Sequence, residues 1–272
     1  MRVAALQYTA TSDCSTNQMV ASKLIDDAVK DDATFITLPE CANLIASHKD
    51  QLFADAKPEA QTAFLQMLQD KAIQHNIWLS AGSLMIAPEQ QDADRRIANR
   101  HYIINPKGDI TARYDKIHMF DAKIAGDRIY RESDSFKAGS EAVIADIDGH
   151  KTGLSICYDI RFGSLYRHYA RQEAEMILIP AAFTKLTGQA HWHVLQRSRA
   201  IETGAFVISA AQTGTHDDGR QTYGHALIIS PWGEIVSDAG EDGDMAIATL
   251  DFTACHAARN ALSAWSKPET KF

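Results

Sequence analysis

The sequence predicts an α/β protein in which helices cover a mixed β-sheet. Short apolar runs, typical of buried strands, recur along the whole chain, and helix-like segments lie between some of them. This alternation of strand, helix and strand is the pattern of an α/β fold with a buried sheet. Turn signals at residues 105–109 and 231–233 add hairpins, so the sheet should be mixed rather than purely parallel.

The expected elements follow from the period of the apolar residues. Apolar runs predict strands at residues 3–8, 35–39, 77–83, 101–105, 110–116, 143–147, 151–157, 176–180, 206–211, 225–230 and 245–250. Helices are expected at 17–30, where Val20, Leu24 and Ala28 recur every four residues, and at 59–75, 162–172 and 191–203. The boundaries of such elements are reliable to about two to four residues.

Length and composition favour one large globular domain that spans residues 1–272. The chain is 45% hydrophobic and 23% charged, with no linker of proline, glycine and serine, no low-complexity block and no internal repeat. The formal net charge of −8 disfavours a general nucleic-acid binder, which needs basic residues to replace the counterions of phosphate. We therefore expect no nucleic-acid partner.

The termini and the cysteines point to a cytoplasmic protein. Residues 1–7 are too short and too soon polar for a signal peptide, and no apolar run reaches membrane-spanning length. The four cysteines are far apart and have no CxxC spacing, which argues against a disulfide framework or a zinc site. A reducing cytoplasm, without a membrane partner, fits this pattern.

Cys157 lies in the most informative segment of the chain, residues 153–162. An apolar run ends at this cysteine and a helix-like pattern begins at once. A thiol at a helix N-terminus can become a thiolate near neutral pH, and the thiolate is the nucleophile of covalent catalysis. The alternative is a buried cysteine that acts as a small hydrophobic residue.

Two more polar residues follow predicted strands in the same way, Glu40 and Lys116. Active sites of α/β proteins gather beyond the carboxyl ends of strands. There the carboxylate could take the thiol proton, and the ammonium could stabilise an oxyanion. The alternatives are a capping role for Glu40 and a surface ion pair of Lys116 with Asp115 or Asp121. The spacing alone does not show that the three residues converge.

The chain resembles the carbon–nitrogen hydrolase, or nitrilase, superfamily. The matching motifs cover nearly the whole chain in family order: LPE at 38–40, YDKIHMFD at 114–121, GLSICYDIRF at 153–162, PAAFT at 180–184, HWH at 191–193, RAIE at 199–202, YGH at 223–225 and PWG at 231–233. The resemblance implies a four-layer α-β-β-α sandwich with two mixed sheets, pairing through its helices into a homodimer or higher homo-oligomer. It implies neither a cofactor nor a metal.

The resemblance also implies roles for the residues at the strand ends. Glu40 would be the general base, Lys116 the lysine that stabilises the oxyanion, and Cys157 the nucleophile. The backbone N–H of Tyr158 would be a second oxyanion donor. The family has a further glutamate near the lysine, and Glu132 falls where that residue would lie; a solvated loop acid is the alternative.

Within the family, the motifs resemble the Nit-type amidase branch, which holds an acidic substrate with an arginine and a threonine. Here these residues would be Arg161, four residues after the nucleophile, and Thr187. A guanidinium suits a substrate carboxylate because it can bind both oxygens. The alternatives are an ion pair of Arg161 with Asp159 or Glu202, and a turn role for Thr187.

The resemblance implies hydrolysis of a small amide that has a carboxylate or α-keto acid end, through a thioester on the cysteine. The branch members most similar to the chain cleave deaminated glutathione into 2-oxoglutarate and cysteinylglycine. An ω-amidase that releases ammonia from 2-oxoglutaramate is the alternative. Two further alternatives are a catalytically silent relative that binds a metabolite and a transferase that captures the thioester with another amine.

Four remaining segments receive no assigned role. His191 and His193 are alternate residues on a predicted helix, so they face different ways and cannot chelate a metal together. Residues 121–131 and 216–220 could set the length of the pocket. Residues 264–272 lack the basic tail of the branch, which leaves the contacts between subunits open.

Overall fold

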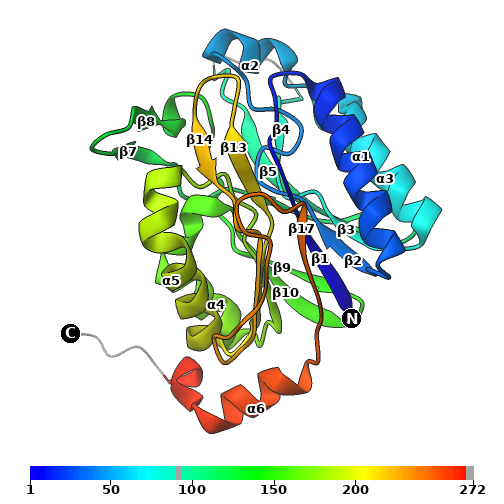
Figure 1. The fold of residues 1–272 in the computed structure, drawn as a ribbon, viewed down its shortest axis with the longest axis vertical. Helices are drawn as coiled ribbons and strands as arrows, with labels where there is room; N and C mark the ends of the chain where they lie inside the picture. Colours follow the sequence, from blue (N-terminus) through cyan, green and yellow to red (C-terminus); the bar gives the residue numbers. More distant parts are fainter. Residues whose placement is uncertain (90–93, 268–272) are drawn as a thin grey trace.

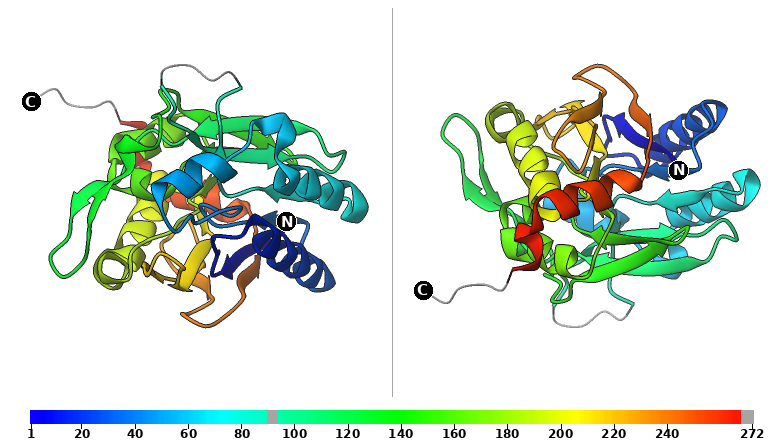
Figure 2. Two further views of the ribbon diagram at one scale, coloured as in Figure 1. Left: turned by 90° about the horizontal axis from the view of Figure 1, so that it is seen from above. Right: turned by 90° about the horizontal axis from the view of Figure 1, so that it is seen from below.

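The protein is a four-layer sandwich in which two mixed β-sheets face each other and helices cover their outer faces (Figures 1 and 2). The computed structural model describes residues 1–89 and 94–267. This architecture is the predicted one. None of the helices among these residues has the length and apolarity that a membrane crossing needs.

The larger sheet has nine strands in the described residues and carries α1 (Cys14–Lys30) and α3 (Ala63–His75) on its outer face. Its strand order is β14 (Gln221–Tyr223), β13 (Ala211–Thr215), β1 (Arg2–Tyr8), β2 (Phe35–Thr37), β3 (Trp78–Ser80), β5 (Ala98–Ile104) and β4 (Leu84–Ile86). In addition, β17 (Met245–Thr249) pairs with β1, and β6 (Ile110–Asp115) pairs with β5. Parallel pairs join β1 to β2 and β13, whereas β5 pairs antiparallel with its neighbours.

The smaller sheet has six strands in the described part of the chain and carries α4 (Gly163–Arg171) and α5 (Lys185–Thr203). Its order is β16 (Ile235–Asp238), β15 (Leu227–Ile229), β12 (Phe206–Ser209), β11 (Met176–Leu178), β10 (His150–Leu154) and β9 (Val143–Ile147). The other elements are the hairpin β7 (Asp121–Lys123) to β8 (Ile129–Arg131), α2 (Lys49–Asp55), α6 (Thr253–Ala261), and the 3-10 turns η1 (Glu59–Gln61), η2 (Glu132–Asp134), η3 (Cys157–Arg161) and η4 (Ser263–Ser266).

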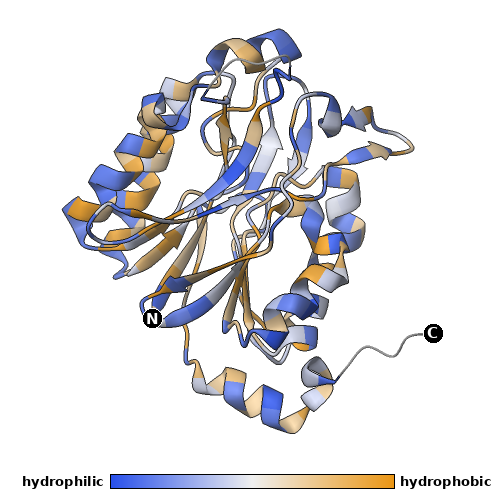
Figure 3. Ribbon diagram, turned by 180° about the vertical axis from the view of Figure 1, so that it is seen from behind, coloured by the Kyte–Doolittle hydropathy of each residue, from blue (hydrophilic) through white to orange (hydrophobic). Residues whose placement is uncertain are grey.

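Strand β1 shows how one apolar run serves two cores. Its side chains alternate, so Val3 and Ala5 face the core that includes residues of both sheets, while Ala4 and Leu6 face α1 and α3. All four side chains are fully buried. A strand buried on both faces is a continuous apolar run, as β1 is in the sequence. Figure 3 shows the outer helices with mixed polar and apolar residues around these strands.

The structure contains each predicted strand and helix, with shifted boundaries. The apolar run at 206–211 was predicted as one strand, but it belongs to two strands in different sheets. β12 of the smaller sheet ends at Ser209, and β13 of the larger sheet begins at Ala211. The helix expected at 191–203 begins earlier, at Lys185, and the 59–75 segment divides into η1 and α3. The atypical tail lies partly beyond the described residues, at 268–272.

Candidate active site

The three residues predicted at strand ends lie together at one end of the two sheets. Glu40 comes three residues after β2, and Lys116 directly follows β6, so both are positioned by the larger sheet. Cys157 opens η3 beyond β10 of the smaller sheet. All three line one pocket of about 370 Å³, together with Glu132. The facing sheets therefore bring together residues that are far apart in the sequence.

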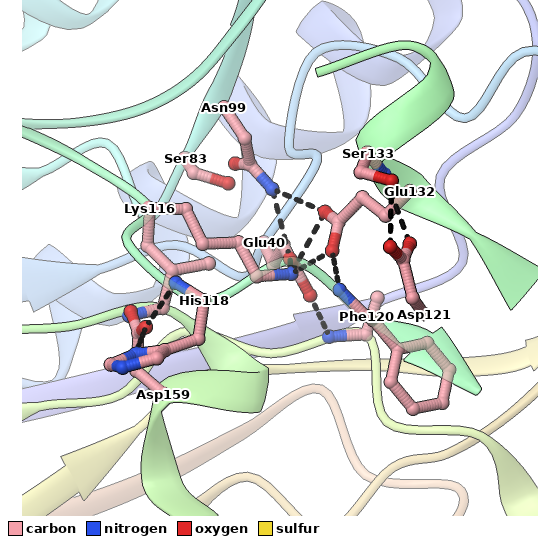
Figure 4. A network of polar contacts seen from close by, with 12 residues as sticks. Glu40, Ser83, Asn99, Lys116, His118, Phe120, Asp121, Glu132, Ser133 and Asp159 are labelled. Carbon is pink, nitrogen blue, oxygen red and sulfur yellow. Dashed lines mark hydrogen bonds and ion pairs between the residues drawn. The ribbon is translucent and has the colours of Figure 1, made fainter. Parts of the chain in front are cut away.

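The Lys116 ammonium lies between two carboxylates (Figure 4). Its Nζ donates to Glu40 Oε1 at 2.9 Å and to both oxygens of Glu132 at 2.8 Å. Lys116 and Glu40 are almost fully buried, so their charges are poorly screened by water. Although burial opposes the charged form of Lys116, the charges of Glu132 and Glu40 raise its pKa well above the ordinary value. The lysine is thus a permanent cation.

Two neutral donors complete the surroundings of Glu40. The Ala182 N–H donates to Oε2 at 2.8 Å, and Asn99 Nδ2 donates to Oε1 at 3.0 Å. Asn99 also reaches Glu132 Oε1 at 3.4 Å, so it bridges the two carboxylates. Gly82, with φ of +65°, packs against the backbone just before Glu40. A Cβ at Gly82 would lie 2.0 Å from Leu38 O, so only glycine fits at this position.

Cys157 occupies a strained backbone position. Its φ is +46°, in the left-handed region that residues other than glycine rarely adopt. The Cys157 N–H donates to Pro180 O at 2.9 Å. The sharp turn from β10 into η3 thereby places the thiol in the pocket that Glu40 and Lys116 also line.

The surroundings of Cys157 oppose the thiolate that the helix-start pattern allows. Burial and the nearby Glu40 charge raise the pKa of the Cys157 thiol well above its ordinary value, and Lys116 offsets only part of this rise. Burial also opposes ionisation of Glu40, but Lys116 and the hydrogen bonds from Cys157 and Ala182 hold the Glu40 pKa below its ordinary value. The resting pair is therefore a neutral thiol beside a carboxylate base.

This pairing predicts an unusual pH dependence for alkylation of Cys157 by iodoacetamide. Because the proton passes to Glu40 and not to bulk water, the rate constant should stay nearly flat from about pH 6 to about pH 8, whereas a thiol that must ionise into bulk gains about tenfold per pH unit. Peptide mass spectrometry can follow Cys157 and half-buried Cys14 in the same sample. A tenfold rise per unit at both cysteines would contradict the pairing.

A buried carboxylate that the sequence analysis did not assign, Asp159, joins the turn that contains Cys157 to the segment that follows strand β6 and contains Lys116. It accepts hydrogen bonds from Tyr114 OH at 2.7 Å, from Ile156 N at 2.9 Å, and from the backbone N and ring Nδ1 of His118 at 3.0 and 2.7 Å. Figure 4 shows Asp159 beneath His118, next to Lys116. Asp159 therefore fixes the spacing between Cys157 and Lys116.

Replacement of Asp159 should destabilise the fold. Asp159→Asn places an amide N–H₂ among groups that all donate, so we expect the free energy of unfolding to fall by about 3 kcal/mol. Urea denaturation measures the change, with the exposed Asp242→Asn as the matched control. A loss no larger than that of the control would show that these four contacts do not hold the turn in place.

The predicted substrate-binding residues lie beside this pocket but are not among the residues that line it. Arg161 stacks over the rings of Tyr158 and Phe183, and its guanidinium is 3.3 Å from His191 Nδ1. Within the described residues Arg161 has no carboxylate partner, because Asp159 and Glu202 pair elsewhere. The predicted alternative of a structural ion pair is therefore wrong.

Tyr158 and Thr187 differ in what they offer a substrate. The Tyr158 N–H lies in the first turn of η3, where backbone donors lack a partner within the helix. The Thr187 hydroxyl is 2.8 Å from that of Thr184, so it is already engaged at the start of α5.

His193 faces away from His191, as their alternate positions predict. Its Nε2 is 3.2 Å from Asp238 Oδ2, and His225 Nδ1 is 2.9 Å from Asp238 Oδ1. The ligand atoms of these three residues lie within 4.8 Å of one another, a spacing that could hold a metal ion. None of the three lines the active-site pocket.

The four-layer sandwich, with a carboxylate, an ammonium and a thiol at one end of its sheets, places this protein in the class with the nitrilase fold. The sequence profile of the family described as "Carbon-nitrogen hydrolase" matches residues 2–260. The chain belongs to this family and is a hydrolase of carbon–nitrogen bonds, as predicted.

Curated relatives and solved structures agree with this assignment. The deaminated glutathione amidases of Dictyostelium discoideum and Synechocystis sp. are 37% and 39% identical over 255 and 251 residues, which are 92% and 91% of this chain and 87% and 90% of theirs. The chain is also 37% identical to the Caenorhabditis elegans fusion protein NitFhit over 92% of its length, but it spans only 57% of that protein.

The structural match is equally extensive. The crystal structure of C. elegans NitFhit superposes with a TM-score of 0.90 at 35% identity, over 98% of this chain and 64% of that one. Saccharomyces cerevisiae Nit3, described as a member of branch 10 of the nitrilase superfamily, superposes with a TM-score of 0.85 at 29% identity, over 96% and 94%.

Proposed function

We propose that the chain is a cysteine-dependent amidase that works through a thioester. The observation that carries this proposal is the single pocket in which the Cys157 thiol, the Glu40 carboxylate and the Lys116 ammonium meet, with Lys116 Nζ 2.9 Å from Glu40 Oε1. One carboxylate thus lies beside both the group that must lose a proton and the cation that can bind an oxyanion. Base, nucleophile and electrophile are within reach of one substrate carbonyl.

The first half of the reaction forms the thioester. Glu40 takes the thiol proton as the Cys157 sulfur attacks the amide carbon, so the raised thiol pKa costs little because the proton moves only to a neighbour. Lys116 and the Tyr158 N–H stabilise the oxyanion of the tetrahedral intermediate. Glu40 then returns the proton to the leaving nitrogen, and the carbon–nitrogen bond breaks.

The second half hydrolyses the thioester. Glu40, again a carboxylate, takes a proton from water, whose oxygen attacks the acyl carbon. The carbon–sulfur bond then breaks, and Glu40 gives the proton to the departing sulfur, which restores the Cys157 thiol and the Glu40 carboxylate and releases the acid. Glu132 keeps Lys116 in place through both of its oxygens, and Asn99 Nδ2 donates to both carboxylates. Glu132 therefore acts as a positioning residue for the cation.

For the substrate we propose the amide of a small α-keto acid, with deaminated glutathione as the first choice. The guanidinium of Arg161, which has no carboxylate partner among the described residues and is supported by two aromatic rings, suits a carboxylate on the acyl part. Relatives that bear the name deaminated glutathione amidase cover almost the whole chain. The ω-amidase substrate 2-oxoglutaramate has the same acyl part, so Arg161 fits it too.

A parallel assay of the two amides tests the proposal. We expect turnover of both, with a higher kcat/KM for deaminated glutathione, measured as release of 2-oxoglutarate without an added amine acceptor. Arg161→Ala should raise KM for both substrates by about tenfold to a hundredfold, because a charge-assisted contact contributes about 1.5–3 kcal/mol. Release of 2-oxoglutarate from neither amide would favour the silent relative.

We further propose a cytoplasmic homodimer that forms through α5. Large apolar side chains are exposed along this helix, among them Val194 at 69% and Ile201 at 51% of their surface. An exposed apolar stripe of this kind marks an interaction surface. Sedimentation velocity of the purified chain and of Val194→Glu tests the pairing, since the buried charge should shift the protein to monomers.

A further inference from the structure

The loop at residues 216–220 is held rigidly at the edge of the active-site pocket. His216 is buried, with Nδ1 at 2.7 Å from Ala10 O and Nε2 at 2.8 Å from the Thr222 hydroxyl. Asp217 accepts from the backbone N and the hydroxyl of Ser12 at 2.7 and 2.6 Å. The loop closes on itself through the His216 N–H, which donates to Arg220 O at 2.9 Å. The backbone of Arg220 is therefore fixed in place before any ligand binds.

The hairpin β7–β8 is tied to this loop. Arg128 donates from NH1 to Asp218 Oδ2 and from NH2 to Asp218 O, both at 3.0 Å. Arg128, Asp218 and Arg220 all line the pocket that holds Cys157. Five Lys or Arg residues and three acids line this pocket, so its lining carries a net positive charge although the whole chain carries −8.

Arg220 is a cation of this edge whose side chain has free hydrogen-bond donors. Within the described residues its guanidinium donates no hydrogen bond and forms only a loose ion pair, with Nε 3.6 Å from Asp218 Oδ2. By contrast, Lys49 donates to Asp134 O at 2.8 Å, and Arg128 is held by Asp218. The charge of Arg220 reaches Cys41, next to the base, where it opposes the rise in thiol pKa that burial causes.

We infer that Arg220 binds a carboxylate on the leaving-amine side of the substrate. The inference rests on the proposed amidase function, in which Arg161 holds the acyl part from the side of η3 and α5. Arg220 approaches the same reaction centre from the loop and hairpin. A guanidinium can bind a carboxylate through two parallel hydrogen bonds, and the fixed backbone of Arg220 lowers the entropy that this binding costs. The pocket thus selects amides whose leaving group ends in a carboxylate, as a dipeptide does.

A pair of substrates that differ in one group tests the inference. One is deaminated glutathione, and the other carries a carboxamide in place of the glycine carboxylate; each is assayed with the wild type, Arg220→Gln and Arg220→Lys. For Arg220→Gln we expect the kcat/KM ratio of acid to carboxamide to fall by about tenfold to a hundredfold, since charge-assisted hydrogen bonds contribute about 1.5–3 kcal/mol. Arg220→Lys should restore part of the ratio.

Lys123→Gln, an exposed cation on the same hairpin, is the matched control and should keep the wild-type ratio. An unchanged ratio in Arg220→Gln, or an equal loss on both substrates, would overturn the inference while leaving the amidase proposal intact. If the wild type released 2-oxoglutarate from neither compound, the proposed function would fail, and the inference with it. Thermal unfolding of each variant separates a loss of binding from a loss of fold.

Discussion

Cys157→Ala is expected to lower kcat by about 10⁴-fold or more, as removal of the nucleophile does in other enzymes with covalent intermediates. Without the sulfur no thioester can form, and the rest of the site can only polarise the carbonyl. The fold should persist, because the buried thiol is replaced by a smaller apolar group. Release of 2-oxoglutarate from deaminated glutathione gives the rate, and circular dichroism checks the fold.

Cys14→Ala is the matched control, since this half-buried thiol lies at the start of α1, outside the active-site pocket. It should retain wild-type kcat. Mass spectrometry of wild-type enzyme quenched during turnover should show the acyl mass on the peptide that contains Cys157. Full activity of Cys157→Ala, or an acyl adduct on another residue, would refute the thioester mechanism.

Lys116→Met is expected to impair both catalysis and stability. Loss of one oxyanion donor typically costs about 10²–10³ in kcat. The variant also leaves Glu40 and Glu132 as buried carboxylates without their shared cation, and breaking such a pair costs about 3–5 kcal/mol of stability. Like-charge repulsion should then raise the Glu40 pKa, which shifts the acid limb of the pH–rate profile to higher pH.

A double variant separates the two effects of Lys116. Adding Glu132→Gln to Lys116→Met removes one of the two unpaired charges, so the melting temperature should recover in part. The kcat should remain low, because the oxyanion donor is still missing. The single variant Glu132→Gln serves as the control. Recovery of kcat in the double variant would mean that Lys116 only balances charge.

Much of the fold could be predicted from local patterns. Strand β1 is a continuous apolar run because both of its faces are buried, and α1 has one apolar side because only one side faces the sheet. Strands β4, β7, β8, β14 and β16 were not predicted. Among these, β7, β8 and β16 expose most of their residues, so no buried apolar run marks them in the sequence. The hydropathy of residues 206–211 also could not predict that this run divides between two sheets, because β12 and the start of β13 are both buried.

The site was only partly predictable for a related reason. Glu40, Lys116 and Cys157 could be singled out because each polar residue ends an apolar run. Asn99 and Asp159 could not, since a polar residue inside a strand or a turn looks the same whether it faces solvent or a carboxylate. Asn99 also precedes the strand predicted at 101–105, whereas the observed strand β5 begins at Ala98, so no pattern marked this residue.

The sequence by itself determined the fold class, the family and the identity of the residues at the strand ends, because hydrophobic period and motif order are properties of neighbours along the chain. Only the tertiary structure decided the surroundings of the Cys157 thiol. The helix-start pattern indicated that this thiol can ionise, whereas burial and the charge of Glu40 raise its pKa. Charge interactions depend on distance through space, and Glu40, Lys116 and Cys157 become neighbours only when the two sheets pack face to face.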